Sequence, residues 1–147
     1  MARTYLKPGF FLKSIVGPIV IRSGRFPVLT VVGRTSGRLR SVPIGPPVEV
    51  KGQRYLVSPR GETHWVCNLR KAGGGRLRSH GLTESFLVVE VDGMERDRAI
   101  AAYRTQAGKM LEPAFARLPD ADDHPTFRLE DVKVILAHGY RLGSARR

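Results

Sequence analysis

Short runs of β-branched and apolar residues, each ended by a turn signal, constrain this chain more than any other feature of its sequence. Residues 26–32, 39–44 and 48–50 are runs of this kind, and glycine, proline or polar residues separate them. The chain holds 16 glycines and 10 prolines, whereas average usage gives roughly 18 of the two together at this length. Such a sequence favours short strands joined by turns over a few long helices.

Similar runs continue toward the C-terminus. They cover residues 55–58, 76–78, 85–91 and, after an irregular region rich in proline and aspartate, 132–137. Five to seven strands of this length, with little helix between them, indicate a mainly β (α+β) protein built as a small antiparallel barrel.

Two segments have helical rather than strand periodicity. A short helix follows Thr63, a residue type that caps helix N-termini, and ends at Gly73–Gly75. A longer helix over Met94–Ala107 begins after Asp92 and stops at Gly108. Its residues predicted to face inward are Ile100 and Tyr103. We therefore expect one longer helix and short flanking helices around the barrel.

Basic residues outnumber acidic ones and are unevenly placed. The chain has 25 Lys+Arg and 13 Asp+Glu, a formal net charge of +12, and eight basic residues precede Glu49, the first acidic residue. A surface of this kind attracts anions. Nucleic acid, an acidic membrane and a phosphorylated small molecule all remain open as partners on charge alone.

Several chemistries are disfavoured by the sequence. Cys67 is the only cysteine, so the chain cannot form an intramolecular disulfide. The four histidines lack the spacing of a metal site, and no serine or cysteine lies in a recognisable nucleophile motif. We predict no metal site, and the sequence assigns no catalytic residue.

The chain is expected to divide into an N-terminal segment, 1–24, and a single domain, 25–147. Residues 10–21 are largely apolar, but Lys13, Gly17 and Pro18 interrupt them, and no stretch reaches the roughly 18 apolar residues that span a membrane. The segment is interpreted either as a short helix covering the core or as a membrane-surface segment. We expect a cytoplasmic protein, with peripheral contact at the inner membrane surface left open.

The turn at residues 33–40 concentrates groups that bind anions. Its two glycines permit a tight backbone path and let amide N–H groups approach a ligand. Hydroxyl and guanidinium donors accompany them: Arg34, Thr35, Ser36, Arg38 and Arg40. The turn is interpreted as an anion cradle on a hairpin; the alternative is an ordinary solvated basic turn.

A second group of residues follows the strand at 55–58. Ser58-Pro59-Arg60-Gly61 ends that strand, and Trp65 and Asn68 lie on the short helix beyond it. Trp65 offers a flat wall for a planar ring, and Asn68 offers an amide donor and acceptor. In the alternative interpretation, Trp65 and Leu69 pack into the core while Asn68 fixes a loop.

The order of these features resembles the deazaflavin-dependent nitroreductase and quinone reductase family, small split β-barrel oxidoreductases that use coenzyme F420. It runs from a strand through the Gly-Arg-Thr-Ser-Gly-x-x-Arg turn, a strand with Val42-Pro43 and a strand ending at Ser58 to Trp65-x-x-Asn68-Leu69. The likeness covers about residues 28–72 and implies a split β-barrel of the FMN-binding type.

The resemblance also implies the residues of a cofactor site. In that family the turn and its trailing arginine hold the cofactor phosphate, the following strand runs beside the cofactor, and the strand-end serine and the tryptophan helix face its ring or tail. The implied cofactor-binding residues here are Arg34, Thr35, Ser36, Gly37, Arg40, Ser41, Val42, Pro43, Ser58, Arg60, His64, Trp65 and Asn68.

The implied activity is hydride transfer from reduced coenzyme F420 to an electrophilic small molecule such as a quinone, an enone or a nitroaromatic. FMN is the alternative cofactor. Two other classes remain open: a basic nucleic-acid-binding barrel, which the scattered aromatic residues disfavour, and a membrane-associated, non-catalytic protein of the same fold. The sequence leaves monomer and homodimer equally open.

Overall fold

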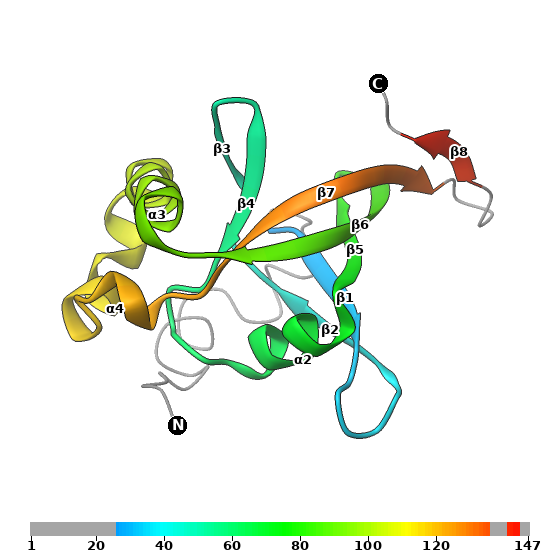
Figure 1. The fold of residues 1–147 in the computed structure, drawn as a ribbon, viewed down its shortest axis with the longest axis horizontal. Coiled ribbons are helices and arrows are strands. Elements are labelled where there is room, and N and C mark those ends of the chain that lie inside the picture. The colour runs from blue at the N-terminus through cyan, green and yellow to red at the C-terminus, as the bar shows by residue number, and fades with distance from the viewer. Residues whose placement is uncertain (1–25, 136–140, 145–147) are drawn as a thin grey trace.

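The computed structural model describes residues 26–135 and 141–144, so the segment predicted at 1–24 lies outside the described residues. Eight antiparallel strands form one curved sheet (Figure 1). They are β1 (Val28–Val32), β2 (Leu39–Pro43), β3 (Val48–Val50), β4 (Gln53–Val57), β5 (Gly74–Ser79), β6 (Leu82–Val91), β7 (Thr126–Ile135) and β8 (Arg141–Ser144). Seven follow the order β2-β1-β5-β6-β7-β4-β3, and β8 pairs with β7.

Two of the connections between strands contain helices, the one from β4 to β5 and the one from β6 to β7. The helices are α2 (His64–Ala72), α3 (Gly93–Ala107) and α4 (Glu112–Arg117), with 3₁₀ turns at Gly108–Leu111 and Ala121–Asp123. The hydroxyl of Thr63 accepts a hydrogen bond from the backbone N–H of Val66, which confirms the predicted cap of α2. The longer helix also begins after Asp92 and ends at Gly108, as predicted.

Two apolar clusters lie on opposite sides of the sheet. One joins α2 to the sheet and consists of Leu29, Val31, Ile44, Leu56, Trp65, Val66, Leu69, Leu77, Phe86, Phe127 and Leu129. The other packs α3 against β3 and β4, and it includes the predicted inward residues Ile100 and Tyr103. Figure 1 shows α2 and α3 on these two sides of the curved sheet. The arrangement fixes α2 beside the β1–β2 hairpin.

Several boundaries differ from the prediction. The last long strand was expected at 132–137, but β7 already begins at Thr126. The irregular region expected before that strand contains α4 and the 3₁₀ turn at Ala121–Asp123. Gly73 does end α2, with a φ of 79°, whereas Gly74 and Gly75 belong to β5 rather than to a turn. None of the described helices is long and apolar enough to cross a membrane.

The glycine pair in β5 lets its neighbouring strands approach closely. A Cβ atom at Gly74 would overlap the backbone carbonyl oxygen of Phe86 in β6, and one at Gly75 would lie 2.9 Å from the carbonyl oxygen of Thr30 in β1. These obstacles are backbone atoms in the middle of a sheet, so a change of side-chain rotamer cannot relieve them.

We predict that Gly74→Ala lowers the free energy of unfolding by about 1 to 3 kcal/mol, the usual cost of overpacking. Urea unfolding followed by circular dichroism measures this difference. The matched control is Arg76→Ala in the same strand, where the side chain is exposed and a change within about 0.5 kcal/mol is expected. Equal stability of Gly74→Ala and wild type would contradict this account of the sheet.

Candidate functional site

A cleft of about 580 Å³ lies between the β1–β2 hairpin and α2. Ten of the 13 predicted site residues line it: Arg34, Thr35, Ser36, Arg40, Ser41, Val42, Arg60, His64, Trp65 and Asn68. Gly37, Pro43 and Ser58 lie outside this lining. The structure thus brings the predicted turn and the predicted tryptophan helix to one cavity.

The β1–β2 turn is a compact loop held by its own backbone. The N–H of Gly33 donates to the carbonyl of Arg38 at 2.7 Å, and the N–H of Gly37 donates to the carbonyl of Gly33 at 3.0 Å. Gly37 has a φ of 75°, which favours glycine. The hydroxyl oxygen of Ser36 accepts from the N–H of Arg38. The turn is therefore held by hydrogen bonds between its own atoms.

Asn68 of α2 anchors this turn. Its Oδ1 atom accepts one hydrogen bond from the backbone N–H of Arg34 at 3.0 Å and another from Nη1 of the same residue at 2.7 Å. Asn68 is buried, whereas Arg34 is exposed. One amide oxygen thus fixes both the backbone and the guanidinium of Arg34.

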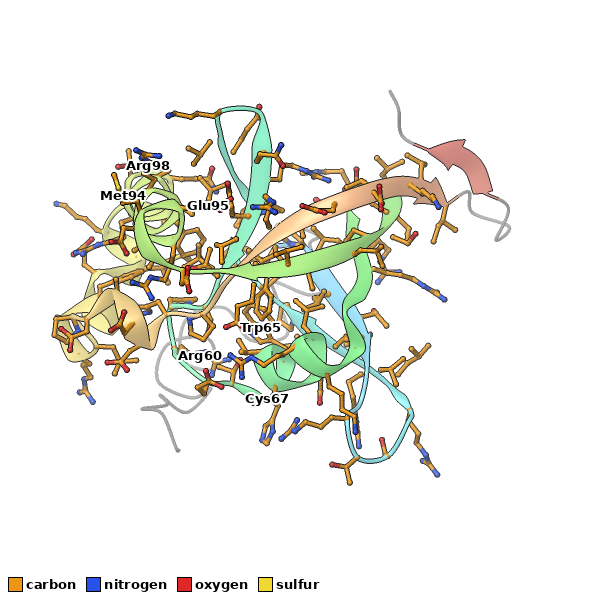
Figure 2. All side chains as sticks on the ribbon, in the orientation of Figure 1. Arg60, Trp65, Cys67, Met94, Glu95 and Arg98 are labelled. Carbon is orange, nitrogen blue, oxygen red and sulfur yellow. The ribbon has the colours of Figure 1, made fainter. Side chains whose placement is uncertain are left out.

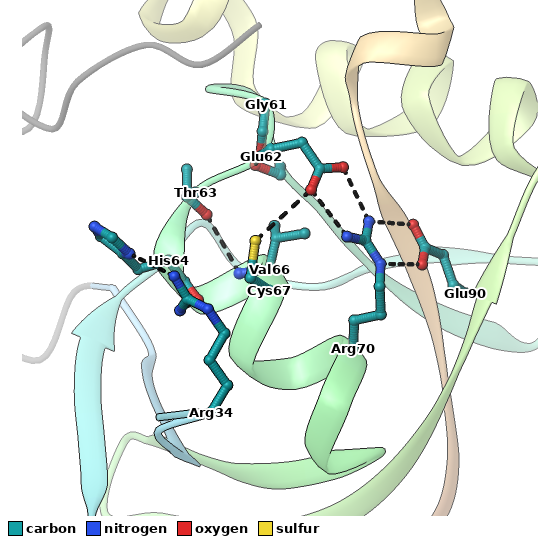
Figure 3. A network of polar contacts seen from close by, with 10 residues as sticks. Arg34, Gly61, Glu62, Thr63, His64, Val66, Cys67, Arg70 and Glu90 are labelled. Carbon is teal, nitrogen blue, oxygen red and sulfur yellow. Dashed lines mark hydrogen bonds and ion pairs between the residues drawn. The ribbon is translucent and has the colours of Figure 1, made fainter. Parts of the chain in front are cut away.

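The Arg34 side chain also reaches the start of α2. Its Nη2 atom lies 3.2 Å from Nδ1 of His64, and Nη1 donates to the backbone carbonyl of His64 at 3.4 Å (Figure 3). No carboxylate of the described residues forms an ion pair with this guanidinium. Its positive charge therefore remains available to an anion in the cleft.

Trp65 serves both the core and the cleft. It is buried, with a ring centroid 6.3 Å from that of Phe127, and it also lines the cavity. Leu69, one turn further along α2, is fully buried in the same cluster. The structure confirms that Trp65 and Leu69 pack into the core, and Trp65 also reaches the cleft.

Positive charge dominates the described lining of the cleft. Arg34, Arg40 and Arg60 line the cavity, and its described lining contains no acidic side chain. Arg70, on another face of α2, binds Glu62 through two hydrogen bonds of 2.9 Å and Glu90 through bonds of 2.7 and 2.8 Å (Figure 3). Arg34 and Arg40 thus make no ion pair with a carboxylate of the described residues.

A second, more apolar cavity of about 240 Å³ adjoins the cleft. Arg60 and Trp65, which are labelled in Figure 2, line both cavities. The predicted residue Pro43 faces this second cavity. Tyr103 lies at its wall, where burial raises the pKa of the phenol. Gly45 must lack a side chain because a Cβ atom there would overlap the Tyr103 hydroxyl.

Ser58 does not face either cavity. It is fully buried, and its hydroxyl donates to the carbonyl of Gly61 at 2.6 Å. Its backbone N–H donates to the carbonyl of Pro125, and its carbonyl lies 2.9 Å from Nδ1 of the buried His124. The structure therefore gives Ser58 a role in holding the loop that carries Arg60, whereas the sequence placed its hydroxyl at a cofactor ring.

Cys67 lies outside the lining of the cleft. Burial, and next the negative charge of Glu62, raise the pKa of its thiol, which keeps it in the unreactive protonated form. No group of three or more potential metal ligands occurs among the described residues.

Three lining residues were not among the predicted site residues: Val31, Gly33 and Thr63. Gly33 belongs to the turn singled out at residues 33–40. A Cβ atom at this position would lie 3.0 Å from the Ser36 hydroxyl oxygen. The sequence predicts Val31 only as part of a strand and Thr63 only as a helix N-cap, and neither pattern predicts a cavity.

No family model and no curated protein matches the chain. The chain does match solved structures. An F420-H2-dependent reductase, FDR-A, has a TM-score of 0.54 and 24% identity, with 72% of this chain and 95% of that chain covered. A NimC/NimA family protein from Clostridium acetobutylicum has a TM-score of 0.54 and 13% identity, with 88% and 96% covered.

A heme-binding protein from Mycobacterium smegmatis gives a TM-score of 0.53 at 14% identity; the match covers 83% of this chain and about half, 53%, of that one. Likeness at this level of identity shows the fold alone. The chain has a mainly β, split-barrel-like fold that it shares with the F420-H2-dependent reductase, which confirms the predicted fold class.

We predict that Asn68→Ala lowers the free energy of unfolding by about 1 to 3 kcal/mol, because two donors of Arg34 lose their acceptor. Asn68→Asp keeps an oxygen at the same place and should retain most of the stability. Urea unfolding of the two variants and wild type measures the difference. Equal losses in Asn68→Ala and Asn68→Asp would show that the bonds to Arg34 contribute little.

Proposed function

We propose that this protein is an oxidoreductase that binds coenzyme F420 in the cationic cleft and reduces a small electrophilic molecule. The observation that carries the proposal is the union of two unlike cavities at Arg60 and Trp65, one cationic and one mostly apolar. A cofactor with an anionic tail and a planar ring system needs both environments.

The residues present fit the anionic part of such a cofactor. Arg34 and Arg40 are exposed at the cleft and can each direct forked N–H donors to a phosphodiester. Thr35 adds a hydroxyl, and the glycine at 33 keeps the space between the turn and the ligand open. Because Asn68 already fixes Arg34, little side-chain freedom is lost when an anion binds.

The adjoining cavity fits the planar part. Trp65 forms a wall that core packing holds in place, and Pro43 and Ile44 supply further apolar surface. Gly45 and the neutral hydroxyl of Tyr103 lie at the same cavity, which gives it a hydrogen-bond donor in apolar surroundings. Ser58 has no part in this proposal.

When bound in reduced form, the cofactor supplies a hydride to an acceptor such as a quinone, an enone or a nitroaromatic. The chain's own residues bind and orient. The cationic turn holds the anionic tail, Trp65 limits the position of the planar group, and the apolar cavity keeps water from the reacting partners. FMN, with a single phosphate and a similar ring, is the competing cofactor.

We predict that Arg40→Ala weakens F420 binding by about 1 to 3 kcal/mol, as expected for a lost charge-assisted contact. Arg34→Ala should weaken binding by a similar amount and also destabilise the turn. The matched control is Arg38→Ala, which removes an exposed arginine of the same turn that does not line the cleft. Equilibrium titration of each purified variant with F420, and separately with FMN, measures these affinities.

Each outcome of the titration has a defined meaning. Equal loss in Arg38→Ala and Arg40→Ala would indicate general charge attraction rather than a phosphate contact. Binding of FMN alone would redirect the proposal to a flavin enzyme. If wild type binds neither cofactor, the oxidoreductase proposal is wrong.

A further inference from the structure

A second group of cations lies on the face of the sheet opposite to α2. Leu29 of β1 and Leu77 of β5 point into the cluster beneath α2. Side chains alternate between the two faces of a strand. Thr30 follows Leu29 in β1 and Arg76 precedes Leu77 in β5, so both point to the outer face. Arg78 does so as well, and both arginines are exposed.

The strand register gathers hydroxyl groups around these two arginines. Arg76 is opposite Thr30 of β1, and Arg78 is opposite Thr83 of β6. Thr30 in turn is opposite Ser41 of β2, and their hydroxyl oxygens are 2.7 Å apart. All five residues line a hollow of about 330 Å³, which shares Ser41 and Val42 with the lining of the cleft. The described lining of this hollow has no acidic side chain.

Arg76 and Arg78 lack the carboxylate partners that five other arginines of the described residues have. The arginines with described carboxylate partners are Arg54, Arg70, Arg96, Arg104 and Arg128. Arg76 and Arg78 make no ion pair with any described residue. Because Arg76 and Arg78 are two positions apart on one face of β5, their Cα atoms are roughly 7 Å from each other. Like charges placed so close repel unless an anion lies between them.

We propose that this outer hollow is a second anion site, which binds a phosphate group carried by a small molecule or by a lipid. A phosphate offers several charged oxygens, so it can accept hydrogen bonds from both guanidinium groups at once. In the Thr30–Ser41 pair one hydroxyl donates to the other, and the second hydroxyl keeps a proton for a ligand. Thr83 adds a further hydroxyl donor.

The site is independent of the proposed oxidoreductase activity. Its arginines do not line the cationic cleft, and the test below contains no cofactor. Failure of one proposal therefore leaves the other standing.

The experiment is a titration of the isotope-labelled full chain with inorganic pyrophosphate, followed by amide NMR shifts. In wild type we expect saturable shifts at Thr30 and Thr83 of the outer hollow, alongside shifts at Thr35 and Ser36 of the cleft. The double variant Arg76→Ala/Arg78→Ala should weaken the outer response at least roughly tenfold and leave the cleft response unchanged.

Arg98→Ala is the matched control because it removes an exposed arginine of α3 that has no described ion-pair partner (Figure 2). It should alter neither response. Comparable weakening by Arg98→Ala, absence of saturable shifts at Thr30 and Thr83, or equally strong shifts with succinate would each overturn the proposal.

Vesicles identify the source of the phosphate. If wild type sediments with phosphatidylglycerol vesicles but not with phosphatidylcholine vesicles, and the double variant does not, the group belongs to an anionic lipid. Saturable pyrophosphate shifts without sedimentation assign the site to a soluble phosphate ester. Sedimentation that the double variant retains would place the lipid contact elsewhere and overturn the lipid assignment.

Discussion

The hydrogen bonds from Arg34 to Oδ1 of Asn68 connect segments 34 residues apart in the chain. They place the β1–β2 turn over the N-terminal half of α2, and the cleft exists because that turn and that helix face each other. The helix is in turn held by Trp65, Val66 and Leu69 in the core. A single amide group therefore links the core beneath α2 to the cationic β1–β2 turn.

Features that depend on neighbouring residues were predictable from the sequence. The cap at Thr63, the turn around Gly37 and the boundaries of α3 each follow from side chains within a few positions. Ser58 was misplaced because its position depends on Pro125 and His124, which are far along the chain. No local signal shows that its N–H, carbonyl and hydroxyl are all occupied by other parts of the protein.

The early part of β7 was missed for a related reason. It contains Arg128 and Glu130, charged residues that are uncommon inside a sheet. In the structure the guanidinium of Arg128 donates to Glu130 at 2.8 Å and to Glu95 of α3 at 2.6 Å. The Tyr55 hydroxyl also donates to Glu95, and this bond, followed by the Arg128 contact, lowers the pKa of that carboxyl. Glu95 of α3, a helix earlier in the chain, thus neutralises a charged side chain of this strand.

The net charge of +12 includes basic side chains that form ion pairs within the protein and others that are exposed without such a pair. Arg70 and Arg128 each hold two carboxylates and thereby attach helices to the sheet. The carboxylates in these pairs do not line the cleft, whose described lining holds arginines and no acidic side chain. Screening by salt weakens the positive field of such arginines at exposed sites but less so within a cleft. Selection of an anion by this protein therefore depends as much on where its acidic residues are bound as on where its arginines are exposed.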